Sequence, residues 1–118
     1  MPTPSQAAYY HRSPRARLFG TTPVALRFAD GRHGRGELKV VSLTGGLLSL
    51  QRPLGWGCRV KLMFLTQTGV VLGEAEMLSP DCWSRQPFRF VALDETEQCR
   101  LRVAIVLSLG QHAVGRVD

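Results

Sequence analysis

The stretch Val40-Val41-Ser42-Leu43-Thr44-Gly45-Gly46-Leu47-Leu48 decides the predicted fold, because it sets a tight turn between two apolar runs. Before the turn, Leu38 and Val40 alternate with charged neighbours, and we expect them on one face of a strand. Such a period of two is typical of a half-buried strand. The apolar pattern resumes at Leu47, so residues 42–46 predict the turn of a β-hairpin.

The same alternation recurs outward from this hairpin along most of the chain. Segments rich in turn-forming residues, such as 30–34 and 66–69, separate the apolar runs. Six short strands joined in this way favour a closed or nearly closed antiparallel β-barrel, which removes exposed strand edges. The predicted strands cover residues 24–29, 37–41, 47–50, 58–65, 70–78 and 87–93. The sequence therefore predicts a mainly β fold.

A C-terminal α-helix is predicted after the last strand. Asp94 is expected as its N-cap, with Glu97 three residues further on, where acidic groups favour the positive end of the helix dipole. Gly110 is expected to end it. A seventh strand is the alternative, because residues 103–106 include three β-branched side chains, although sixteen residues are long for a strand.

The chain of 118 residues suits a single domain with an arm and a tail. Residues 1–21 contain three prolines but no acidic residue, and they carry Arg12, Arg15 and Arg17, which predicts a flexible basic arm. The barrel and its helix are expected over residues 22–109, followed by a tail at residues 110–118.

The charge balance indicates an anionic partner. Fifteen Lys and Arg against nine Asp and Glu give a net charge of +6. No apolar run approaches the roughly 20 residues that cross a bilayer, and the N-terminus lacks the layout of a secretory signal. We therefore expect a cytoplasmic domain without a membrane span.

Motifs that would indicate catalysis do not emerge. The chain has neither a nucleophile elbow nor a phosphate loop, and its three cysteines and three histidines are too widely spaced for a metal-site motif. We expect a binding protein rather than an enzyme, with no cofactor and no metal.

The hairpin resembles a signature of PilZ domains, in which Asp or Asn is followed by any residue, Ser, two further residues and Gly. Ser42 and Gly45 match that signature, whereas Val40 stands where it has Asp or Asn. The family also has two arginines separated by three residues before the first strand. Arg12, Arg15 and Arg17 occupy that region with a different spacing.

The resemblance implies a six-stranded barrel with a C-terminal helix that binds the bacterial second messenger cyclic di-GMP. It implies that Arg12, Arg15 and Arg17 clamp the phosphates and guanine edges, while the turn at Ser42, Gly45 and Gly46 cradles the other side. Docking the ligand would fix the arm against the barrel and relay a signal to a partner protein.

Two further interpretations remain open. Position 40 has valine where the signature has Asp or Asn, and the arginine spacing is irregular. Both features are also compatible with a degenerate PilZ-like domain that binds no nucleotide and serves protein–protein interaction. A basic β-barrel could instead bind single-stranded nucleic acid, although nucleic acid is the less favoured partner.

Overall fold

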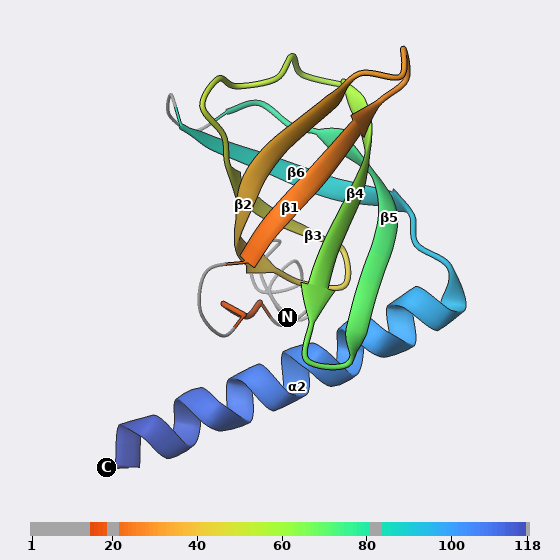
Figure 1. Cartoon of the computed structure of the whole chain (residues 1–118). Helices are drawn as coiled ribbons and strands as arrows, with labels where there is room; N and C mark the ends of the chain where they lie inside the picture. The colour runs from red at the N-terminus through yellow and green to blue at the C-terminus, as the bar shows by residue number, and fades with distance from the viewer. Residues whose placement is uncertain (1–14, 19–21, 81–83, 118) are drawn as a thin grey trace, which may run out of the picture.

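Six antiparallel strands form a closed barrel, and a helix crosses one end of it (Figure 1). The structure is a computed structural model that describes residues 15–18, 22–80 and 84–117. The neighbours around the barrel follow the order β1-β2-β3-β6-β5-β4. The elements are β1 Thr22–Phe28, β2 His33–Val41, β3 Gly45–Ser49, β4 Arg59–Thr66, β5 Gly69–Met77, β6 Arg85–Ala92 and α2 Glu95–Val117. The predicted six-stranded barrel with a C-terminal helix is confirmed.

The end of the helix differs from the prediction. Residues 95–117 form one helix of 23 residues, so the segment is not a seventh strand, and the helix continues through Gly110 instead of ending there. Residues 110–117, expected as a tail, are therefore helical. A glycine inside a helix costs only about 1 kcal/mol relative to alanine, and no proline follows it. Within the described residues, no helix has both the length and the apolar character needed to span a membrane.

The alternation seen in the sequence builds the core. Strand β4 shows the pattern most clearly, because every second side chain from Val60 to Thr66 is buried and the others are exposed. One side of α2 closes the end of the barrel with Leu101 and Ile105. The strands contribute Val24, Leu26, Leu38, Val41, Leu48, Val60, Leu62, Phe64, Val71, Ala75, Met77 and Phe88 to this core, and Leu50 joins it just after β3.

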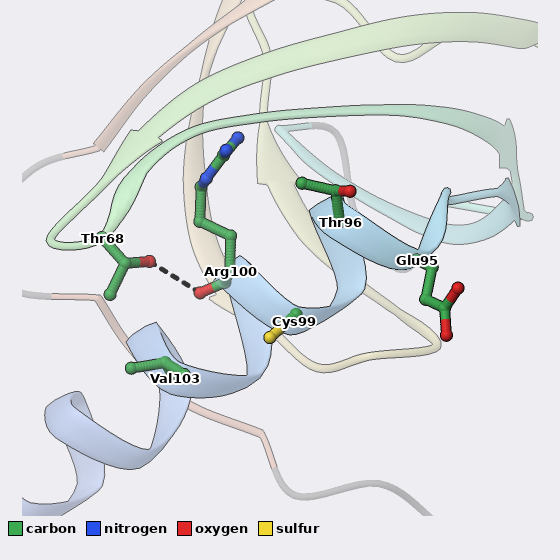
Figure 2. A pocket seen from close by; sticks show the side chains of 6 residues that line it. All are labelled: Thr68, Glu95, Thr96, Cys99, Arg100 and Val103. Atoms are coloured by element: carbon green, nitrogen blue, oxygen red, sulfur yellow. Dashed lines mark hydrogen bonds between the residues drawn. The ribbon is translucent and has the colours of Figure 1, made fainter.

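Helix α2 also occupies part of the edge of β5. Strand β6 pairs with residues 74–77 of β5 and then turns away toward the helix. Next to this pairing, the amide of Leu72 donates to Glu97 Oε2 at 3.1 Å, and Arg100 Nη1 donates to the carbonyl of Val70 at 2.5 Å. Thr68 Oγ1 donates to the carbonyl of Arg100 at 2.7 Å (Figure 2). Helix side chains thus satisfy backbone groups that a strand would otherwise pair.

Candidate functional site

The hydroxyl of Ser42 points into its own turn. Only 2% of the residue is exposed. Its Oγ lies 3.0 Å from Thr44 Oγ1 and 3.2 Å from the carbonyl of Gly45, and it accepts from the amide of Thr44 at 3.2 Å. These are the local contacts that a serine makes when it stabilises a tight turn.

The turn between β4 and β5 has the same arrangement. Thr66 Oγ1 lies 3.1 Å from Thr68 Oγ1, donates to the carbonyl of Gly69 at 2.7 Å and accepts from the amide of Thr68 at 3.2 Å. In sequence the two turns read Ser42-Leu43-Thr44-Gly45 and Thr66-Gln67-Thr68-Gly69. The chain therefore builds this hydroxyl turn twice, and local hairpin geometry is sufficient to explain Ser42.

Gly45 and Gly46 already belong to β3 instead of the turn, and neither has a positive φ. A Cβ at Gly45 would collide with the backbone carbonyl of Phe88 on β6, and one at Gly46 would collide with the carbonyl of Val40 on β2. Both glycines are thus required because neighbouring backbone lies too close for a side chain.

The prediction that Val40 shares a face with Leu38 is wrong, because a β-bulge lies between the two residues. The register between β2 and β3 shifts between Leu38 and Val40, so Val41 rather than Val40 follows Leu38 into the core, with Val41 fully buried. The bulge inserts one extra residue and reverses the alternation after it. Val40 consequently turns to the outer surface, at the position where the PilZ signature has a polar residue.

The described part of the arm is attached to the barrel. Ala16 and Val41 exchange two backbone hydrogen bonds, at 2.8 and 2.9 Å, and Ala16 is only 3% exposed. Ser108 Oγ on α2 donates to the carbonyl of Arg17 at 2.5 Å. The segment expected to be flexible is therefore packed at residues 16–17. Arg15 and Arg17 flank Ala16 with exposed side chains, and the predicted site residue Arg12 lies outside the described residues.

A hollow of about 570 Å³ lies between this segment and the outer faces of β2 and β3. We call it the arm hollow. It collects three cationic side chains from three parts of the chain, Arg17, Lys39 and Arg85, of which Lys39 is paired with Glu37 at 3.1 Å. The described residues that line it are Arg17, Leu18, Glu37, Leu38, Lys39, Val40, Leu47, Ser49, Ser84 and Arg85.

Only some of the predicted site residues line the arm hollow. Arg17 lines it beside Val40, whereas Ser42, Gly45 and Gly46 are not among the described lining residues. Lys39 and Arg85 were not among the predicted site residues. Lys39 could have been found as the outward residue next to the signature, while Arg85 is brought there by the pairing of Ser49 with Arg85, which no local pattern indicates.

The barrel, its strand order and its terminal helix define the fold of PilZ domains. The PilZ domain of Escherichia coli YcgR, solved with c-di-GMP, has a TM-score of 0.72 and 22% identity over 92% of this chain and 97% of that one. YcgR in complex with c-di-GMP has a TM-score of 0.71 and 25% identity over 92% of this chain and 49% of its own. The complex of MrkH from K. pneumonia with c-di-GMP has a TM-score of 0.69 and 18% identity over 87% of this chain and 52% of its own.

This chain thus spans about half the length of the YcgR and MrkH chains. Its sequence matches no protein-family model and no curated protein. At these identities the likeness establishes the fold, and the ligand has to be argued from the residues.

Proposed function

We propose that this chain binds cyclic di-GMP in the arm hollow, without chemistry on the ligand, and relays its presence to a partner protein. The observation that carries the proposal is the position of the arm hollow. A cationic concavity lies on the outer face of the signature strand, bounded by the segment that holds the arm arginines. Structures of the same fold were solved with this nucleotide.

The charges of the arm hollow suit a cyclic dinucleotide with two phosphates. The guanidinium groups of Arg17 and Arg85 present planar forks that match phosphate oxygens or a guanine edge. Arg15, one residue before the bridge at Ala16, and Arg12, three residues earlier in the sequence, would supply additional cations from the same arm. A hollow of about 570 Å³ is within the usual size of small-molecule pockets.

Val40 places an apolar side chain in the hollow at the position where the PilZ signature has Asp or Asn. Together with Leu18 and Leu47 it forms an apolar wall, against which the flat face of a base can pack. The wall cannot replace the hydrogen bond that an Asp or Asn would make. A hydrogen bond to a charged group contributes about 1.5–3 kcal/mol. Its absence here should weaken the affinity for the nucleotide roughly tenfold to hundredfold.

The relay is supported by the contacts of Arg17. Its backbone carbonyl accepts from Ser108 of α2, and its neighbour Ala16 is bridged to β2. A ligand held by arm arginines stabilises this attached arrangement of arm, barrel and helix, because a ligand shifts an equilibrium toward the state that it binds better. The partner would then recognise the state in which the arm and α2 are fixed together.

A PilZ fold that has lost its nucleotide is the second candidate function. The observations that favour it are the apolar Val40 in the arm hollow and the inward hydroxyl of Ser42, which is already occupied by its own turn. In that case the attached arm is a permanent part of the domain, and the chain acts only by binding another protein.

Isothermal titration calorimetry with cyclic di-GMP tests the proposal. We expect saturable heat with the wild type, affinity reduced about tenfold or more by Arg17→Ala because a charged contact is lost, and unchanged affinity for Arg52→Ala. Arg52 is an exposed arginine that does not line the hollow. Absence of heat at high micromolar nucleotide favours the second candidate. If a single-stranded oligonucleotide competes with cyclic di-GMP, and both substitutions weaken its binding equally, the chain binds nucleic acid in general.

A further inference from the structure

A second hollow, of about 550 Å³, lies on the outer faces of β1, β4 and β5. We call it the outer groove. Because β4 stands three places from β3 in the ring of six strands, this groove is on the opposite side of the barrel from the arm hollow (Figure 1). Its lining includes Ala25 and Arg27 from β1, Lys61 and Met63 from β4, and Leu72 and Glu74 from β5.

Large apolar side chains are exposed in and beside the outer groove. Met63 is directly opposite Leu72, and Leu65 is directly opposite Val70, in the register of β4 and β5. Their exposed fractions are 47% and 51% for the first pair and 67% and 41% for the second. Four adjacent apolar side chains make a contiguous patch, which is a feature of interaction sites more than of ordinary surface.

Two cations lie side by side on the same face. Arg27 on β1 is directly opposite Lys61 on β4, and Lys61 in turn is opposite Glu74 on β5. Like charges in such positions are destabilising, and among the described residues neither Arg27 nor Lys61 has an ion-pair partner. An anionic group docked on Arg27 and Lys61 would remove this repulsion.

Carboxylates lie next to these cations in the same groove. Glu74 on β5 and Asp94 before α2 line it together with the cations, so the groove carries both signs of charge. A uniformly anionic lipid surface would be repelled by Glu74 and Asp94, whereas a polypeptide can place a carboxylate against the cations and a donor against the carboxylates. The charge pattern therefore favours a protein as the occupant.

We propose that the outer groove docks a partner protein through a segment that packs apolar side chains on Met63 and Leu72 and places a carboxylate against Arg27 and Lys61. The idea that the groove is the output surface of a receptor rests on the proposed function. The docking chemistry itself uses none of the residues that line the arm hollow.

Selection from a phage-displayed library of random peptides on the full chain tests the groove. We expect enriched peptides that combine apolar residues with Asp or Glu. Their affinity should fall about tenfold or more with Arg27→Glu/Lys61→Glu, because a charge-assisted contact is lost, and also with Met63→Ser/Leu72→Ser. The matched control, Arg52→Glu/Arg102→Glu, changes charge equally at exposed positions outside the groove and should leave affinity unchanged.

Several results would overturn this inference. The first is that no peptide is enriched over an unrelated bait. The second is that Lys- and Arg-rich peptides are enriched, and the third is that peptide affinity falls equally in the groove and control variants. Groove-dependent sedimentation with phosphatidylserine vesicles would assign the face to a membrane, and a groove-dependent dimer in sedimentation velocity would assign it to a second copy. Thermal melting verifies that each variant folds, and cyclic di-GMP titration of the same variants reports separately on the proposed function.

Discussion

At the scale of single residues, the PilZ-like signature of this chain is explained by packing and turn geometry. Ser42 satisfies its own turn, while Gly45 and Gly46 allow β3 to lie close to its neighbours. Only the outward position, here Val40, faces the arm hollow. The signature therefore shapes the strand that carries the site, and the charges come from Arg17, Lys39 and Arg85.

Substituting Gly45 by alanine should destabilise the barrel. The new Cβ would meet the carbonyl of Phe88 and lie 2.8 Å from Arg89 Cα, and forcing a methyl group into a filled space typically costs about 1–3 kcal/mol. Urea denaturation measures the loss. Gly55→Ala is the matched control, because nothing lies within 4 Å of the position that its added methyl group would take and its φ is not positive. Equal stability of the two variants would contradict the packing explanation.

Ser42→Ala should lower the free energy of unfolding even without nucleotide. The amides of Thr44 and Gly45 and the carbonyl of Gly45 lose their hydroxyl partner, at a cost of about 1–3 kcal/mol. Thr66→Ala in the equivalent turn should cost a similar amount, as measured by thermal and urea unfolding. If Ser42→Ala weakened only cyclic di-GMP binding and left stability unchanged, the turn explanation would be wrong.

The sequence predicted this hairpin but not the orientation of its residues. The repeated Ser/Thr-x-Thr-Gly pattern at residues 42–45 and 66–69 is visible in the sequence and indicates a turn. The bulge that turns Val40 outward has no local signal, because it depends on how β2 pairs with β3. Register is set by contacts between strands, so strict alternation wrongly placed Val40 on the same face as Leu38.

At the scale of elements, α2 contacts both the barrel and the described arm segment. Its first turns bind the edge of β5 through Glu97 and Arg100, and its later part binds the arm segment through Ser108. Acidic residues at its start and the apolar spacing of Leu101 and Ile105 made the helix predictable. Its attachment to β5 and to residue 17 was not predictable, since both contacts are distant in sequence.

Arg100→Ala should loosen α2 from β5. The guanidinium donates to the carbonyl of Val70 and pairs with Glu97 at 3.3 Å. Because the side chain is partly exposed, we expect a loss of only about 1 kcal/mol. Hydrogen exchange should show faster exchange at the amide of Leu72, which donates to Glu97. Arg102→Ala, at an exposed helical position, should leave that amide unchanged, and equal effects would argue against a specific latch.

Ser108→Ala should release the arm segment. Ser108 is only 1% exposed and its hydroxyl donates to the carbonyl of Arg17, and losing a buried hydrogen bond costs about 1–3 kcal/mol. The amide of Val41, which donates to Ala16, should then exchange faster. If cyclic di-GMP needs the attached arm, the affinity should fall severalfold in the same variant. Unchanged exchange at Val41 would show that the helix does not hold the arm.

At the scale of the whole molecule, barrel closure separates two surfaces. The outer faces of β2 and β3 form the arm hollow, and those of β1, β4 and β5 form the outer groove. Composition predicted an anionic partner from the net charge of +6, but not the division of the cations between two faces. That division depends on the strand order, which places β6 and its Arg85 beside β3.

Amide NMR mapping with cyclic di-GMP tests the central claim most directly, because it reports both binding and location. The account predicts saturable shifts at residues 15–18, 38–40, 47–49 and 84–85, which surround the arm hollow. These shifts should be strongly reduced by Arg17→Ala, with smaller changes along residues 61–63 of β4. Absence of shifts at high micromolar nucleotide, or shifts centred on residues 61–63 and 72–74, would contradict it.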